Sequence, residues 1–132
     1  MVKHYFDIGD DAWGLIVCYD VDVMDKDRKE SIGIMDSFGL PWGRIHETIR
    51  VLEKPDTAVT ITREDLRMSV MLISSCITSP SSFWNTMAHE LTHVTMAIID
   101  YYGVEYWEES TAYLQGHLFQ RVVESIAVPC KN

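Results

Sequence analysis

The sequence predicts an α+β domain in which short strands come first and long helices come last. Four runs rich in β-branched and aromatic residues lie before Cys76. Two longer segments with helical periodicity follow Ser79, and each ends near a glycine or a proline. At 132 residues and 47% hydrophobic composition, the chain is long enough to bury the core of one domain. We therefore expect residues 1–132 to form a single domain with a small, mainly antiparallel sheet.

The predicted strands come in two pairs. Residues 3–8 and 13–22 are separated by the turn sequence GDDA, which predicts a hairpin. Residues 57–62 and 67–75 are two further β-branched runs around the acidic turn REDL. Four short strands are therefore expected before the long helices begin.

One short helix is expected between the two pairs of strands. Residues 24–31, MDKDRKES, are charged and are predicted to form a turn. Within residues 38–54 a proline lies near the start of a short helix, in which Ile45, Ile49 and Leu52 share one face.

Two longer helices are expected to complete the chain. The sequence SPSSFWNTM supplies serine and proline start signals, and Gly103 is a suitable stop. A helix is therefore expected over residues 81–102. A second helix is expected over residues 106–127, because Pro129 then interrupts the helical pattern.

Charge and cysteine content exclude several classes of protein. The net charge of −9 argues against nucleic acid and acidic membrane surfaces as partners, since both are bound by lysine and arginine. Cys18, Cys76 and Cys130 are odd in number and form no CxxC pair, so neither a disulfide framework nor a thiolate zinc site is expected. No signal region and no membrane-spanning run is present, so a cytoplasmic protein is expected.

The sequence HELTH, which begins at His89, is the strongest functional signal in the chain. His89 and His93 are four residues apart, which on a helix places their Cβ atoms roughly 6 Å apart on one face. Glu90 points about 100° away from His89, too far round to be a convenient third ligand but close enough to reach a metal-bound water. In this HExxH arrangement zinc takes the histidines and the glutamate acts as general base.

A purely structural helix is the alternative interpretation of this segment. The flanking Met87, Leu91 and Val94 suit a buried core, and the histidines would then be polar groups with partners inside it. Each polar group left without a partner costs roughly 1–3 kcal/mol, so the cluster would need several partners. One metal ion satisfies the whole cluster, which favours the metal site.

A catalytic zinc ion needs a third protein ligand and one open position. Glu108 and Glu109 at the start of the last helix are the candidates. Glu108 points away from the face that begins at Glu109, and we expect it to be a solvated acid near a helix N-terminus. The alternative is that both glutamates are simple N-terminal acids. The face that begins at Glu109 carries a carboxylate followed by very small residues, so it is predicted to pack closely on another helix. The residues at helical spacing on this face are Glu109, Ala112, Tyr113, Gly116 and Gln120.

The sequences AHELTHVT at residues 88–95 and EESTAY at residues 108–113 together resemble the gluzincin metallopeptidases. The resemblance is greatest to minimal single-domain gluzincins and to small zinc-peptidase-like proteins of phages and other bacterial mobile elements. It implies a minimal zincin fold, with a small sheet, an active-site helix and a helix for the third ligand. It also implies that His89, His93 and Glu109 hold Zn²⁺, since Glu109 fits the Glu-x-x-Ala pattern of this family.

Two departures from the family pattern concern groups around the zinc ion. Many relatives carry an aspartate that bonds the first zinc histidine where this chain has Tyr113. Thermolysin-like enzymes also have a second domain, which supplies a cationic or phenolic group for the tetrahedral intermediate, and this chain is too short to contain one. Tyr113 and His117 are the candidate replacements, while His4 and His46 have no spacing that suggests a role.

The expected function is zinc-dependent hydrolysis of peptide bonds in a peptide or protein substrate. Glu90 is expected to deprotonate the zinc-bound water. The alternative is a zinc-stabilised binding or regulatory module on a peptidase-like scaffold, which the missing second domain favours. The intact Glu90 favours the enzyme. The peptide specificity and the oligomeric state do not follow from the sequence.

Overall fold

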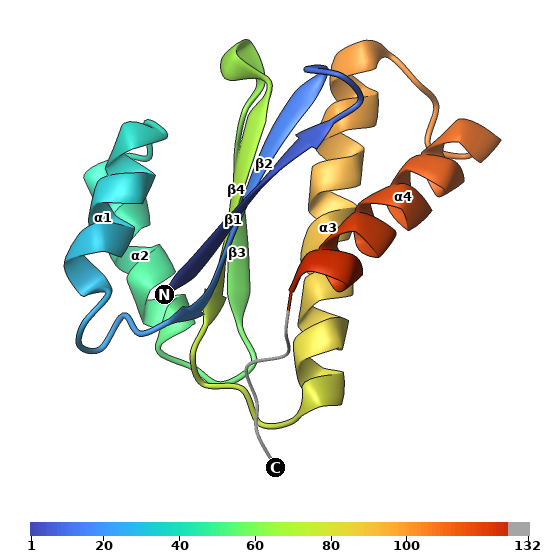
Figure 1. Ribbon diagram of the computed structural model, residues 1–132. Coiled ribbons are helices and arrows are strands. Elements are labelled where there is room, and N and C mark those ends of the chain that lie inside the picture. The colour runs from blue at the N-terminus through green and yellow to red at the C-terminus, as the bar shows by residue number, and fades with distance from the viewer. Residues whose placement is uncertain (127–132) are drawn as a thin grey trace.

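The computed structural model describes residues 1–126 and shows an α+β fold built on one four-stranded sheet (Figure 1). The strands are β1 (Val2–Ile8), β2 (Trp13–Val21), β3 (Ala58–Arg63) and β4 (Met68–Ser74). Their order across the sheet is β1-β2-β4-β3. The pairs β1/β2 and β3/β4 are antiparallel, whereas β2 and β4 are parallel. The predicted hairpin and the two strands around REDL are confirmed, and β3 lies at one edge of the sheet.

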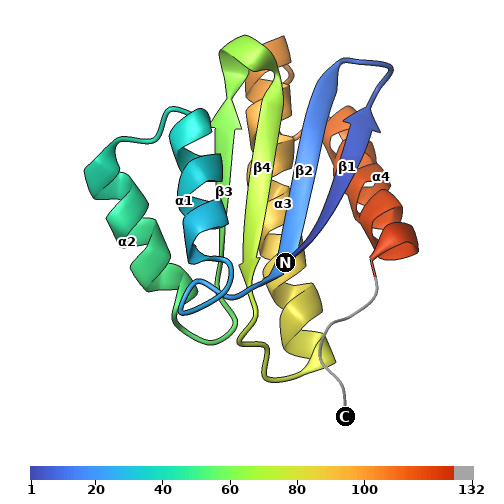
Figure 2. The same cartoon turned by 60° about the vertical axis from the view of Figure 1, so that its left-hand side comes forward.

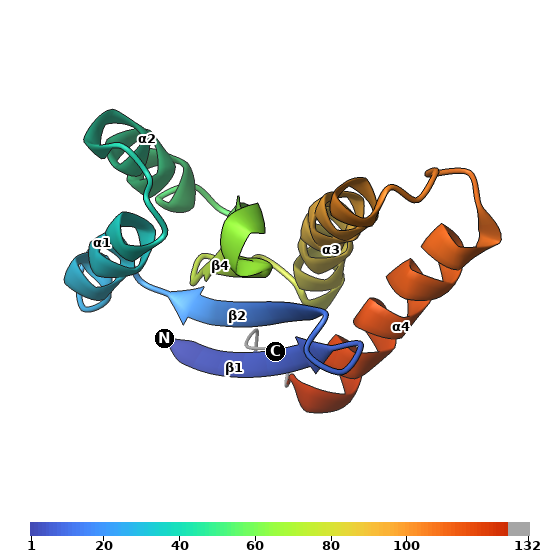
Figure 3. The same ribbon diagram turned by 90° about the horizontal axis from the view of Figure 1, so that it is seen from above.

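Helices cover both faces of the sheet. Helices α1 (Arg28–Ser37) and α2 (Trp42–Leu52) lie on one face, and α3 (Pro80–Tyr102) and α4 (Glu109–Ser125) lie on the other. Figure 2 looks onto the sheet with α3 behind it, and Figure 3 shows the three layers from above. In the view from above, α2 and α3 stand on opposite sides of the end of the sheet that carries β3 and β4.

The prediction of a turn over residues 24–31 is wrong in its second half, because α1 begins at Arg28. Only Ser31 and Met35 of α1 are fully buried, so the helix carries little of the apolar periodicity that would reveal it in the sequence. Its entry is fixed by Asp27, whose carboxylate accepts a hydrogen bond of 2.9 Å from the Asp22 N–H. The charged sequence alone does not predict this hydrogen bond between Asp22 and Asp27.

The central strands are buried on both faces, which divides the core into two clusters. Leu15 and Val17 of β2 point toward α3, while Cys18 points toward α1 and α2. The alternation follows from the two-residue period of a strand. In β4, Met71 joins the first cluster and Leu72 the second. The two clusters hold both helical layers against the sheet and thereby fix where α2 and α3 stand around β3.

The long helix α3 ends at the predicted residue and begins one residue before the predicted start. Ser79 is the N-cap and its hydroxyl accepts a hydrogen bond from the Ser82 N–H at 3.1 Å, while Gly103 ends the helix with a φ of +71°. The second predicted helix begins later than expected, at Glu109 rather than at residue 106, and Ala127 lies outside the described residues. Within residues 1–126, no helix is both long enough and apolar enough to cross a membrane.

Candidate metal centre

Three side chains on α3 bring metal-ligating atoms together. The Nε2 atoms of His89 and His93 are 3.3 Å apart, and Oε2 of Glu90 lies 3.7 Å from Nε2 of His89. The three ligand atoms all lie within 4.8 Å of one another, so the group could hold a metal ion. The predicted pairing of the two histidines on one helical face is confirmed. We refer to these residues as the His–Glu–His group.

The helix gives the three residues different environments. Glu90 turns toward the sheet and is only 5% exposed, whereas the His89 side chain is 70% exposed. Oε1 of Glu90 accepts a hydrogen bond of 2.9 Å from the Thr60 hydroxyl on β3. The carboxylate is therefore anchored to the edge strand, and the imidazoles remain accessible from solvent.

A cleft of about 620 Å³ lies beside the His–Glu–His group, with β3, α3 and α2 around it. A second hollow of about 290 Å³ shares Ala58, His89 and Glu90 with the first, so Glu90 borders both hollows. We call the larger hollow the β3 cleft. It is lined by Leu40, Arg44, Thr48, residues 58–62, His89, Glu90 and His93.

Glu109, the expected third ligand, lies outside the His–Glu–His group. It is the first residue of α4 and is exposed. Helix α4 contacts α3 through Gln115, whose amide oxygen accepts a hydrogen bond of 2.5 Å from Thr95 and whose nitrogen donates one of 3.3 Å to Thr92. Neither hydrogen bond involves Glu109, which lies six residues before Gln115 in α4. Its role as a ligand stays a prediction.

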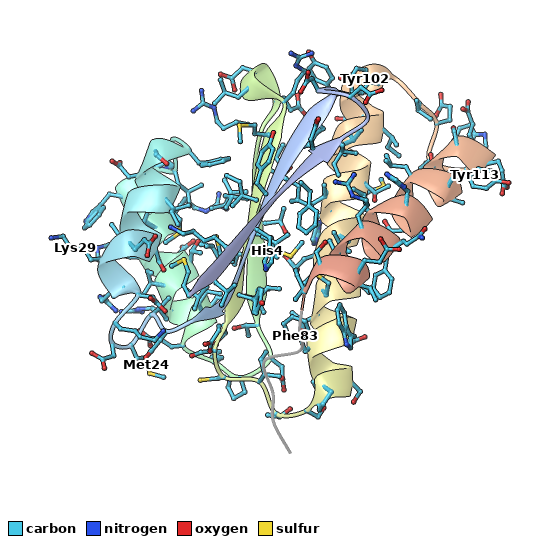
Figure 4. The ribbon with its side chains drawn as sticks, in the orientation of Figure 1. His4, Met24, Lys29, Phe83, Tyr102 and Tyr113 are labelled. Atoms are coloured by element: carbon cyan, nitrogen blue, oxygen red, sulfur yellow. The ribbon has the colours of Figure 1, made fainter. Side chains whose placement is uncertain are left out.

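The prediction that α4 packs through its small-residue face is wrong. Tyr113 is 72% exposed and points away from α3 in Figure 4, and Gly116 is exposed as well. The helix packs instead through Leu114, Leu118 and Val122, which join the core beneath α3. Burial of these larger apolar side chains releases more free energy than close approach of small ones, and this sets the rotation of α4.

The remaining candidates also lie outside the His–Glu–His group. His117 and Glu108 are exposed, and neither belongs to the group of metal-ligating atoms. The structure instead brings Thr60, Thr48 and Arg44 to the β3 cleft, and sequence analysis did not identify them. No local pattern could have done so, because Thr60 meets Glu90 across 30 residues of sequence.

No protein-family model matches the chain, and no curated protein or solved structure matches it significantly.

Proposed function

We propose that the chain is a zinc-dependent peptide hydrolase with its active site at the His–Glu–His group. The observation that carries the proposal is the pairing of two accessible imidazole nitrogens, 3.3 Å apart, beside a buried carboxylate at the wall of a cleft. Neutral imidazole is a preferred ligand of zinc, and a nearby glutamate that is not needed as a ligand is available as a base.

The two histidines would hold the ion from one side. His89 and His93 present the same ring nitrogen toward each other, and both rings are exposed rather than engaged in the core. A bound zinc ion supplies a Lewis acid and lowers the pKa of a coordinated water to near 7. Glu109 is the proposed third protein ligand, as the resemblance to gluzincins implies.

Glu90 is suited to move a proton. Thr60 fixes Oε1 by a hydrogen bond, and Oε2 is left on the side of His89. In the proposed reaction Oε2 takes a proton from the attacking water, whose oxygen forms a bond to the peptide carbonyl carbon. The C–N bond then breaks, and Glu90 passes the proton to the leaving nitrogen. The products are one carboxylic acid and one amine, and Glu90 returns to its starting state.

The β3 cleft suits an extended peptide. β3 is an edge strand, so the backbone groups on its outer side are not used by the sheet. Five consecutive residues of this strand, 58–62, line the cleft. A peptide can add to such an edge through backbone hydrogen bonds. Because Glu90 borders both hollows, a chain lying along β3 would pass the proposed base.

A second function is favoured by the position of Glu109. In the described structure Glu90, and not Glu109, supplies the third ligand atom near the histidines. If Glu90 binds the metal itself, no free base remains, and the site would stabilise a non-catalytic binding or regulatory module. The two functions therefore differ in what Glu90 does.

Substitution of Glu90 by glutamine tests the proposal. Glutamine keeps the size of the side chain but takes up no proton at neutral pH, so hydrolysis of an unstructured peptide mixture should fall at least ~10²-fold with zinc content unchanged. A chelator-treated sample controls for contaminating serine proteases. No cleavage by the zinc-loaded wild type, or equal cleavage by Glu90→Gln, contradicts the enzyme. Loss of zinc from Glu90→Gln supports the binding module.

A further inference from the structure

The β3 cleft contains one permanently charged cation. Arg44 lines the cleft from α2, and among the described lining residues it is the only lysine or arginine. Glu90 is the only aspartate or glutamate among the same residues, and it is buried and bonded to Thr60. Among the residues that line the cleft, the accessible charge on the α2 side is therefore positive, although the chain as a whole carries −9.

The guanidinium of Arg44 is weakly engaged within the molecule. Its nearest carboxylate is Glu47 on the same helix, with Nε and Oε2 separated by 3.7 Å. The two side chains are 69% and 76% exposed, and ion pairs of this kind contribute only about 0–1 kcal/mol. Across residues 1–126 no hydrogen bond is found from this guanidinium. A carboxylate entering the cleft could replace Glu47 at little cost.

The two hollows differ in charge. The smaller hollow is lined by Asp56 and contains no lysine or arginine among its described residues. The Asp56 carboxylate accepts hydrogen bonds from the N–H and hydroxyl of Thr78, which hold it in place. An acidic side chain is therefore favoured at the Arg44 end and disfavoured at the Asp56 end.

We propose that Arg44 is a specificity-determining residue that binds an aspartate or glutamate side chain of the peptide lying along β3. The inference rests on the proposed function, in which the cleft receives an extended peptide. The planar guanidinium presents paired N–H donors that match both oxygens of a carboxylate, which gives geometric selectivity as well as attraction. Acidic segments are thus the expected substrate class.

The test uses the zinc-loaded full chain and a synthetic library of short peptides, blocked at both ends and randomised in the centre. Mass spectrometry of the products should show aspartate or glutamate enriched about tenfold at one fixed position relative to the cut. Arg44→Gln should abolish this enrichment, and Arg44→Glu should replace it with enrichment of lysine and arginine. The matched control is Arg50→Gln, which removes the same charge from an exposed position of α2 outside the cleft and should keep the preference.

Two outcomes of the cleavage assay overturn the inference and leave the proposed function standing. One is cleavage without any acidic preference, and the other is a preference that survives in Arg44→Gln. A retention experiment removes the dependence on turnover. The zinc-loaded Glu90→Gln chain is immobilised and exposed to the same library. Acidic peptides retained by it, and not by the double variant with Arg44→Gln, support acidic recognition even if the wild type cuts nothing. Retention without an acidic excess overturns it.

Discussion

The hydroxyl of Thr60 on the edge strand β3 donates a hydrogen bond of 2.9 Å to Oε1 of Glu90 on α3. Glu90 is 5% exposed, so this bond is made where a lone carboxylate oxygen would be costly. The bond leaves Oε2 as the oxygen closest to His89. The edge strand therefore has two relations to the site: it lines the cleft, and it orients the proposed base.

Thr60→Val should uncouple the base from the strand without changing the shape of the side chain. Valine has no hydroxyl to donate, so one buried oxygen of Glu90 loses its partner, and the free energy of unfolding should fall by about 1–3 kcal/mol. The rate of peptide hydrolysis should fall about tenfold, with zinc content unchanged. Thr60→Ser, which keeps the hydroxyl, should restore most of the rate. Hydrolysis by Thr60→Val at the wild-type rate would show that this bond does not position Glu90.

The histidine pair should decide metal content. The chain purified without chelator should carry close to one zinc per molecule, and His89→Ala or His93→Ala should remove it, because two remaining ligands seldom hold zinc. His46→Ala is the matched control, since His46 lies on α2, packs against exposed Trp42 and is outside the His–Glu–His group. Elemental analysis of the purified variants measures this. Full zinc content in both α3 variants would refute the metal site.

Much of the fold could be predicted because local periodicity and tertiary packing agree. The strands β2 and β4 are rich in apolar residues, and their burial on both faces preserves that signal. Helix α3 has serine and proline at its start and Gly103 at its end, so its boundaries are local features. Helix α1 was missed because its charged first turn resembles a loop and only Ser31 and Met35 are fully buried.

The site was predictable only where it lies within one helix. His89 and His93 meet because they are one turn apart on α3, and any helix through this motif would pair them. Thr60 and Arg44 come from other elements, and their approach depends on how α2, β3 and α3 pack. The rotation of α4 was predicted wrongly for the same reason. Its small residues suggested a contact face, whereas Leu118 and Val122 determine which side is buried.

Cys18 should make stability fall at alkaline pH. Burial raises the pKa of its thiol from 9.0 to about 11. Between these values the unfolded chain loses the thiol proton and the folded chain keeps it, so ionisation favours unfolding as pH rises from about 9 to about 11. The contribution is about 2–3 kcal/mol near pH 11 and is absent below about pH 8. Chemical denaturation near pH 8 and near pH 11 measures the free energy of unfolding at the two values. Between them this free energy should fall less for Cys18→Ala than for the wild type. Equal losses would refute the prediction.

The two adjacent glutamates at the start of α4 should differ in their effect on zinc binding. Glu109→Ala should weaken zinc affinity at least about tenfold, while Glu108→Ala, which removes the same charge one residue earlier, should leave it nearly unchanged. The difference is expected because only Glu109 fits the ligand pattern of the gluzincins. Since Glu109 lies outside the His–Glu–His group, its binding requires the first turn of α4 to approach the histidines.

Hydrogen exchange measures independently whether the first turn of α4 approaches the histidines when zinc binds. Addition of zinc to the metal-free chain should slow amide exchange in the first turn of α4, and Glu109→Ala should remove this protection while Glu108→Ala retains it. The opposite ranking of the two variants would show that Glu108 is the ligand. If neither variant changes zinc affinity and Glu90→Ala abolishes it, Glu90 is the third ligand. The carboxylate bonded to Thr60 would then hold the metal instead of moving a proton, and the site would belong to a binding module.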